Sequence, residues 1–193
     1  MMRIITGKAK GIRLNTLDGE ATRPTAERVK ESVFSMLQFD LENREILDLF
    51  AGSGQMGLEA VSRGAAHATL VDQSKDAIRI IQENVTKTRL QGQCTVYQGS
   101  AIDYIRRNHG TKADIVFLDP PYASGLYAPV LRALWESEMI KGTTILVCES
   151  DTEAIFGDDQ ALLSLYEIQK TVRYGRTVVS LLQLKQEGDH ENS

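Results

Sequence analysis

The chain has 193 residues, of which 42% are hydrophobic and 25% charged, and its formal net charge is −4. This balance is typical of one folded domain with a large core, and it excludes a protein that is basic over its whole surface. The sequence contains no apolar run long enough for a transmembrane helix and no signal-peptide pattern, so we expect a soluble cytoplasmic protein. Cys94 and Cys148 lie in strand-like runs without metal-ligand spacing and are predicted to be reduced core thiols.

The first predicted unit is a small N-terminal extension over residues 1–42. Residues 2–14 mix apolar and basic side chains and carry two glycines, a pattern that predicts a β-hairpin with one apolar and one basic face. After a polar loop, a helix is predicted to begin at Pro24, because apolar residues recur at positions 29, 33, 36 and 37.

Charge is concentrated in this extension. Residues 1–30 contain seven basic and three acidic residues, whereas residues 31–193 contain 15 basic and 23 acidic ones. A basic segment on an acidic body predicts a local contact with a polyanion. A solvated hairpin face explains the charges equally well, so charge alone leaves both interpretations open.

From residue 43 to residue 184, strand-like runs alternate with helical patterns. The predicted strands cover residues 46–50, 68–72, 95–97, 114–118 and 144–149, followed by a hairpin of residues 165–173 and 177–184. The sequence therefore predicts an α/β fold, with a Rossmann-like, mostly parallel seven-stranded sheet, helices on both faces and an antiparallel C-terminal hairpin. An apolar stripe from Tyr127 to Trp135 is predicted to be core, and residues 185–193 to be a disordered tail.

A glycine turn follows the first predicted strand of this unit. Gly52, Gly54 and Gly57 have the spacing G-x-G-x-x-G, which allows a tight turn and a close approach of the backbone to a ligand. The pattern alone is weak. It gains weight because a strand precedes it, a helix follows it, and Asp72 ends the next strand, where a carboxylate suits a ribose diol.

The most specific string is Asp119-Pro120-Pro121-Tyr122, at the end of the fourth predicted strand. Two consecutive prolines cannot continue a central strand, and they fix a rigid turn that places a carboxylate near an aromatic ring. Asp119 and the Pro120 carbonyl can accept two N–H bonds from the exocyclic amine of a base, while Tyr122 stacks on the ring. The alternative is a loop whose prolines only end the strand.

Together these segments resemble a known family. The string from Asp48 to Gly54 with residues 119–122 resembles Rossmann-like class I methyltransferases that use S-adenosylmethionine to methylate an exocyclic amine of a base. More narrowly, the chain resembles the bacterial 16S rRNA guanine-N2 methyltransferases of the RsmD type. The segments that carry this resemblance are residues 2–8, Arg23-Pro24-Thr25, residues 28–31, residues 58–60, Ser62-Arg63-Gly64-Ala65 and Arg173-Tyr174-Gly175.

The resemblance implies a site and its partners. The implied cofactor-binding residues are Asp48, Phe50, Ala51, Gly52, Ser53, Gly54, Gly57, Asp72, Gln73, Ser100 and Ala101. The implied catalytic residues are Asp119, Pro120, Pro121 and Tyr122. The implied RNA-binding residues are Arg3, Lys8, Lys10, Arg13, Arg23, Thr25 and Arg28. The partner would be 16S rRNA, either free or within a small-subunit assembly intermediate, and we expect a monomer without a metal. Where the family commonly has an acidic residue, this chain has Ser100, so the adenine contact is expected to be weaker or to pass to Asp103 or to backbone.

Three other readings share part of this evidence. A nicotinamide-dependent oxidoreductase shares the glycine turn but does not explain residues 119–122. An adenine-N6 methyltransferase on DNA or RNA shares that string, but it usually needs a recognition domain for which the chain has little room. A non-catalytic RNA-binding module with a retained cofactor fold would bind the cofactor and be inactive on every RNA.

Overall fold

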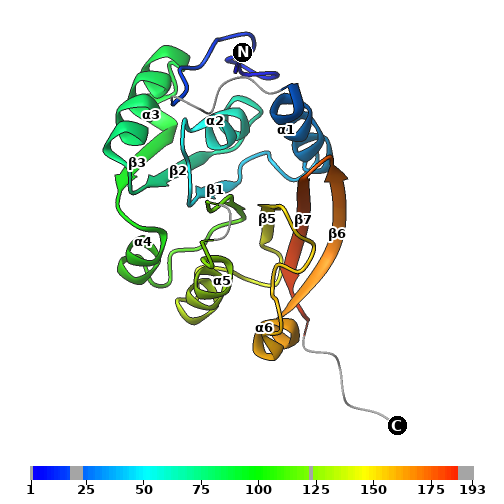
Figure 1. Cartoon of the computed structure of the whole chain (residues 1–193). Helices are drawn as coiled ribbons and strands as arrows, with labels where there is room; N and C mark the ends of the chain where they lie inside the picture. The colour runs from blue at the N-terminus through cyan, green and yellow to red at the C-terminus, as the bar shows by residue number, and fades with distance from the viewer. Residues whose placement is uncertain (1, 18–23, 122–123, 187–193) are drawn as a thin grey trace.

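The computed structural model describes residues 2–17, 24–121 and 124–186, with only the backbone of residues 24–26. One seven-stranded sheet with the order β3-β2-β1-β4-β5-β7-β6 forms its centre (Figure 1). The strands are β1 Glu45–Asp48, β2 His67–Asp72, β3 Cys94–Gln98, β4 Ile115–Leu118, β5 Ile145–Ser150, β6 Tyr166–Tyr174 and β7 Thr177–Leu184. The helices are α1 Pro24–Met36, α2 Gln55–Ser62, α3 Lys75–Thr88, α4 Ala101–Arg107, α5 Tyr127–Glu136 and α6 Gln160–Leu165, with a 3-10 turn at Gln91–Gln93.

The strand pairing confirms the predicted α/β architecture. β1 to β5 are parallel to one another, whereas β7 is antiparallel to both of its neighbours, β5 and β6. All four residues of β4 are buried, as expected for a central strand covered on both faces. Parallel pairing places the carboxyl ends of β1, β2, β3 and β4 at one edge of the sheet, and this is the edge where open α/β sheets bind ligands.

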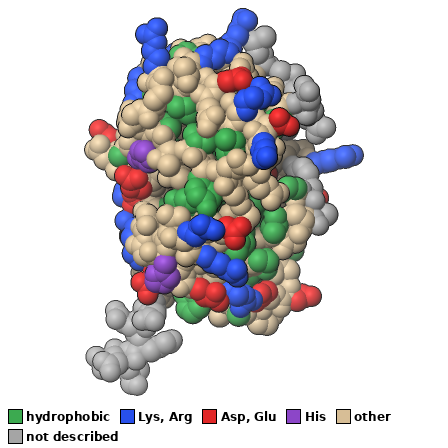
Figure 2. Space-filling model, turned by 90° about the vertical axis from the view of Figure 1, so that its left-hand side faces the viewer, with side chains coloured by type: hydrophobic (Ala, Val, Ile, Leu, Met, Phe, Trp, Pro, Cys, Tyr) green, Lys and Arg blue, Asp and Glu red, His purple; other side chains and the backbone are tan. Residues whose placement is uncertain are grey.

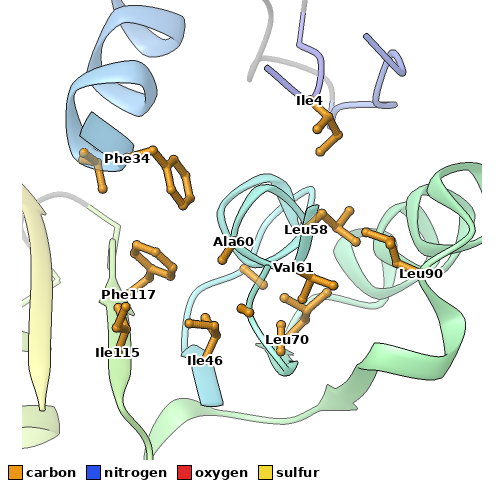
Figure 3. Close-up of a cluster of buried hydrophobic side chains, with 14 of the residues drawn as sticks. Ile4, Phe34, Ile46, Leu58, Ala60, Val61, Leu70, Leu90, Ile115 and Phe117 are labelled. Atoms are coloured by element: carbon orange, nitrogen blue, oxygen red, sulfur yellow. The ribbon is translucent and has the colours of Figure 1, made fainter. Parts of the chain in front are cut away.

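Two helical layers enclose the sheet. α1, α2 and α3 pack on one face, where Phe34 of α1 points toward Phe117 of β4 with ring centroids 5.9 Å apart (Figure 3). α4, α5 and α6 pack on the other face, in a second cluster that includes Ile105, Leu131 and Leu162. Because side chains alternate along a strand, each inner strand contributes to both clusters.

The N-terminal extension packs on α2. The predicted hairpin is present as a single antiparallel bridge between Arg3 and Arg13, flanked by backbone hydrogen bonds. The predicted apolar face is confirmed, because Met2, Ile4 and Leu14 are buried in the same cluster as α2. Figure 3 shows Ile4 next to Leu58 of α2. The extension therefore shares its hydrophobic core with the sheet.

Several sequence expectations need correction. Trp135 is 46% exposed, so the predicted stripe of α5 buries Val130, Leu131 and Leu134 but not the tryptophan. Helix α6 had no predicted counterpart, since six residues are too few to show a period. Of the predicted disordered tail, residues 187–193 lie outside the described part of the chain.

The predicted core thiols are confirmed in part. Both cysteines are free, Cys148 is buried, and Cys94 is half-buried. In the described part of the chain, no helix is both long and apolar enough to cross a membrane.

Candidate active site

The glycine turn joins the end of β1 to the start of α2. Gly52 and Gly54 have positive φ angles of 54° and 78°, a conformation that side chains rarely adopt. The Gly54 N–H donates to the Ala51 carbonyl at 2.6 Å and so closes the turn tightly. Gly57 packs on β2, because a Cβ at this position would lie 2.2 Å from Leu70 Cδ2. The three glycines therefore serve the turn and the helix–strand packing that their spacing predicts.

Asp72, at the end of β2, is bonded directly to this turn. Its Oδ2 accepts the Gly52 N–H at 2.9 Å, and its Oδ1 accepts the Ser74 N–H at 2.8 Å. Two backbone donors thus orient the carboxylate, and each oxygen has a lone pair left for a further donor such as a ribose hydroxyl. The neighbouring Gln73 is exposed at the same edge.

Asp48, at the end of β1, is a buried carboxyl beneath the turn. Its Oδ2 accepts the Gly57 N–H at 3.3 Å. Burial, together with the nearby charge of Asp72, raises the pKa of Asp48 to about 7. A carboxyl with this pKa gains its charge readily when a cation binds next to it.

Two buried polar atoms at the turn support a ligand site. Within the described chain, Ser53 Oγ and Gln55 Oε1 are buried without a hydrogen-bond partner. Such atoms cost free energy unless something satisfies them. The Ser53 carbonyl, by contrast, accepts a bond from Asn84 Nδ2 at 2.9 Å, so α3 holds the turn in place. The site thus combines two unsatisfied polar atoms, the carboxyl groups of Asp48 and Asp72, and the positive end of α2. These groups fit a ligand that carries hydroxyl groups and a positive charge.

Ser100 begins α4 at the end of β3. Its Oγ accepts the Asp103 N–H at 3.1 Å and donates to Asp103 Oδ2 at 2.8 Å, so both side chains serve the helix cap. The next residue, Ala101, is buried. Ser100 therefore caps α4 as an acidic residue could, but without a charge.

The end of β4 carries the predicted catalytic string. Asp119 and Pro121 are exposed, whereas Pro120 is buried. The Pro121 carbonyl accepts the Ser124 N–H at 3.1 Å. The β1–β4 pairing sets Asp48 beside Phe117, two residues before Asp119, so this string and the glycine turn share one edge. Tyr122 lies outside the described residues.

The predicted RNA-binding residues differ in their availability. Lys10, Arg13 and Arg28 are exposed, Arg3 forms an ion pair with Glu27 at 2.9 Å, and Lys8 donates to Gln93. Arg23 lies outside the described residues, as does the side chain of Thr25.

One part of the basic segment was misread. Lys30 is 1% exposed, and its Nζ lies 3.5 Å from the buried carboxylate of Glu59 and donates to the Arg3 carbonyl at 2.6 Å. It is therefore part of the core and cannot contact RNA.

Sequence reasoning missed three residues that hold the site together. Glu59 anchors the extension to α2, and Asn84 bonds both Asn15 and the glycine turn. The Tyr127 hydroxyl donates to the Leu118 carbonyl at 3.1 Å and to the Glu149 carbonyl, so it fastens the ends of β4 and β5. The sequence offered one signal for the role of Glu59. It lies in the apolar run Gly57-Leu58-Glu59-Ala60-Val61, and a charged side chain in a buried run needs a partner.

The sheet order and the site define the class of protein. In dinucleotide-binding Rossmann folds the sixth strand lies beside the fifth, whereas here antiparallel β7 separates β5 from β6. With the carboxylates at the ends of β1, β2 and β4, this topology is that of a class I methyltransferase.

Comparisons with known proteins agree and name the family. The model of the family described as "Conserved hypothetical protein 95" matches residues 2–183, and the chain belongs to this family. Ribosomal RNA small subunit methyltransferase D of Escherichia coli (strain K12) is 34% identical over 152 residues, which cover 79% of this chain and 76% of the relative. The Haemophilus influenzae protein of the same name is 32% identical over 154 residues, covering 79% and 80%.

Solved structures show the same fold. "Putative methyltransferase yhhF" from Escherichia coli has a TM-score of 0.82 at 28% identity and covers 95% of this chain and 98% of that chain. SMU.776, solved in complex with SAH, has a TM-score of 0.68 at 15% identity, covering 84% and 50%, and shows the likeness of fold alone. The predicted methyltransferase class and family are confirmed, and the oxidoreductase reading is not supported.

Proposed function

We propose that this chain transfers a methyl group from S-adenosylmethionine to the exocyclic N2 amine of a guanine in 16S ribosomal RNA. The observation that carries the proposal is the shared edge of the sheet, which sets the Asp119 turn next to the glycine turn and Asp72. The relatives named as small-subunit rRNA methyltransferases support RNA as the substrate. In this assignment residues 1–42 hold the RNA and residues 43–184 perform the transfer.

The cofactor would lie across the ends of β1, β2 and β3. Asp72 would accept the ribose hydroxyls, because two backbone N–H groups already orient its carboxylate toward this edge. Asp48 and the glycine turn would surround the methionine part, and the partnerless Ser53 Oγ would gain a polar partner there. Ser100, Ala101 and Gln73 would lie beside the adenine. When bound, S-adenosylmethionine would supply an electrophilic methyl group, and breakage of its S–CH3 bond would leave the neutral thioether S-adenosylhomocysteine.

The chain's own contribution to the reaction would be positioning and electrostatics. The N2 lone pair of guanine is delocalised into the ring, so this amine is a weak nucleophile. Asp119 and the Pro120 carbonyl would accept its two N–H bonds, which favours positive charge on nitrogen and aims the lone pair at the methyl group. Asp119 or water would then take the released proton. Tyr122 would stack on the base, which must leave its own stack to reach the pocket.

Methyl transfer from labelled cofactor tests this proposal. The substrates are small ribosomal subunits and naked 16S rRNA from a strain without the corresponding methyltransferase, and the product nucleoside is identified. N2-methylguanosine at one site is the expected result, and the preferred substrate shows which assembly state is recognised. N6-methyladenosine would support the second candidate, an adenine methyltransferase with the same pocket. Cofactor binding without transfer to any RNA would overturn the proposed substrate.

A matched pair of variants tests the role of Asp119. Asp119→Asn keeps the size of the side chain but removes its charge, and we expect transfer to slow by about 10²-fold or more with unchanged cofactor affinity. Asp158→Asn makes the same change at an exposed loop position before α6 and should leave transfer unchanged. Full activity of Asp119→Asn would refute the assigned role.

A further inference from the structure

A groove separates the N-terminal extension from the C-terminal end of α3. Its volume is about 410 Å³, and it is lined by Lys8, Ile12, Lys87, Thr88, Arg89 and Leu90. Two segments far apart in the sequence, residues 8–12 and 87–90, form this groove. The charges of either segment alone therefore do not predict it. In Figure 2, Lys and Arg side chains gather at the top of the face that carries α3, near the N-terminal segment.

The lining residues of this groove contribute positive charge and no carboxylate. None of the ion pairs found in the described part of the chain involves Lys8, Lys87 or Arg89. The two lysines are held by neutral amides instead, since Lys87 Nζ donates to Asn15 Oδ1 at 2.9 Å and Lys8 Nζ donates to Gln93. These bonds orient the ammonium groups without neutralising them.

The surrounding residues offset this charge only in part. Glu83, one turn earlier on α3, attracts Lys87 electrostatically, but it also accepts bonds from Asn15 Nδ2 at 2.7 Å and from Arg79 at 2.9 Å, so its single charge is shared between two cations. The C-terminal end of α3 is the negative end of a helix dipole, and cations in the last turn commonly offset it. That role accounts for Lys87 and Arg89 but not for Lys8, which comes from the extension.

The groove is also fixed in shape. Lys8 follows Gly7, whose backbone touches the end of α2, and the Lys8 N–H donates to the Ser62 carbonyl at 2.9 Å. Arg89 is the C-terminal cap of α3, and its backbone has a left-handed φ of 59°. The half-buried Ile12 adds some apolar surface against which a sugar can pack, and the buried Leu90 supports it from below. Cations held in place beside a small apolar surface match the phosphate and ribose of a nucleic-acid strand.

We propose that this groove binds the phosphate backbone of the RNA substrate and extends the RNA-binding surface from the extension onto α3 through Lys87 and Arg89. The inference rests on the proposed function, because it takes RNA as the substrate. It assigns a contact to α3, on which sequence analysis placed no RNA-binding residue.

A pair of double charge reversals tests the proposal. Lys87→Glu with Arg89→Glu changes the groove, and Arg106→Glu with Arg107→Glu makes the same change in the last turn of α4 as a matched control. RNA affinity is measured against salt concentration, together with cofactor affinity and thermal stability. We expect the groove variant to bind RNA about tenfold more weakly or worse, with a salt slope lower by about 0.7 to 0.9 for each lost phosphate contact. Its cofactor affinity should equal that of the unmodified protein.

The outcomes separate this proposal from the proposed function. If the groove variant and the control have the same RNA affinity and salt slope, the groove proposal is wrong, even where the unmodified protein methylates 16S rRNA. The unmodified protein could instead bind RNA without methylating it. If the groove variant then still shows weaker RNA binding and a lower salt slope than the control, the groove proposal stands and the proposed methyl transfer is wrong. Lys87→Gln with Arg89→Gln removes the charges without reversing them, and it replaces the first variant if reversal prevents folding.

Discussion

Glu59 is the residue whose replacement tests the architecture most directly. Its side chain is fully buried, and its carboxylate accepts the N–H groups of Ile5 at 2.7 Å and Thr6 at 3.0 Å. Arg63 Nε donates to it at 2.8 Å, and the buried Lys30 Nζ lies 3.5 Å away. One carboxylate thus joins the N-terminal hairpin, α1 and α2. The substitution Glu59→Gln keeps its shape and removes its charge.

The expected cost follows from the group left behind. After the substitution, Lys30 stays in the core with the Arg3 carbonyl at 2.6 Å and the Met2 sulfur at 3.9 Å, and the neutral amide at position 59 no longer balances its charge. Breaking a buried ion pair from one side typically costs about 3–5 kcal/mol. We therefore expect Glu59→Gln to lower the free energy of unfolding by about that amount, a large share of the ~5–15 kcal/mol typical of a domain.

The pH dependence provides a second readout. Burial lowers the pKa of Lys30 from 10.5, and the charge of Glu59 opposes this shift. When the pKa of a lysine is lower in the folded state than in the unfolded state, its charge reduces stability at any pH below the folded-state pKa. This cost shrinks as the pH rises from the folded-state pKa to the unfolded-state pKa. Without Glu59 the pKa falls further, so the deficit of the variant should be largest at neutral pH and shrink under alkaline conditions.

Urea unfolding at neutral and alkaline pH measures both effects. Glu31→Gln, an exposed position on the same helix as Lys30, is the control and should change stability little. Combining Glu59→Gln with Lys30→Met should recover part of the loss, because no unpaired buried charge remains. A cost for Glu59→Gln below about 1 kcal/mol, or a deficit that grows with pH, would refute the reasoning.

Three further predictions concern the site and the extension. The pKa of Asp48 is raised to about 7, and a cationic cofactor favours the charged form of this carboxyl. Cofactor affinity should therefore rise with pH up to about 7, and binding should release a proton. Calorimetry in buffers of different ionisation enthalpy measures this release. Asp48→Asn should abolish that release, and pH-independent binding by the unmodified protein would contradict the prediction. Gly7→Ala should detach the extension, because its Cβ would lie 1.7 Å from the Ser62 carbonyl oxygen at a φ of 86°. Gly11→Ala has a similar φ of 83° but open space, so it should cost only the backbone strain of about 1–3 kcal/mol, and equal losses in urea unfolding would disprove the clash. Ser100→Asp adds a carboxylate beside the proposed adenine site and should tighten cofactor binding by about two- to tenfold, as one net hydrogen bond allows; an unchanged dissociation constant would place that contact elsewhere.

Local patterns were sufficient for most of the fold. The apolar run of residues 115–118 predicted a strand buried on both faces, and all four residues are buried. Ser74, a residue type that favours helix N-termini, directly precedes α3, and its side chain accepts the Ala77 N–H. Such features follow from residues that are neighbours in the chain. Helix α6 was not predicted, because its six residues are too few to show a helical period. Trp135 was wrongly placed in the core, because its burial depends on how α5 is rotated against the sheet.

The sequence by itself determined the order of strands and helices, the glycine turn and the strand ends that carry carboxylates, because hydrophobic periodicity and turn chemistry act over a few residues. Only the tertiary structure decided which charges are free. Lys30 looks like a surface cation beside Arg28, yet it is buried against Glu59, a residue 29 positions away. Lys8 and Arg89 meet at one groove for the same reason. Charge pairing is a property of distance in space, and the packing of the extension on α2 sets that distance.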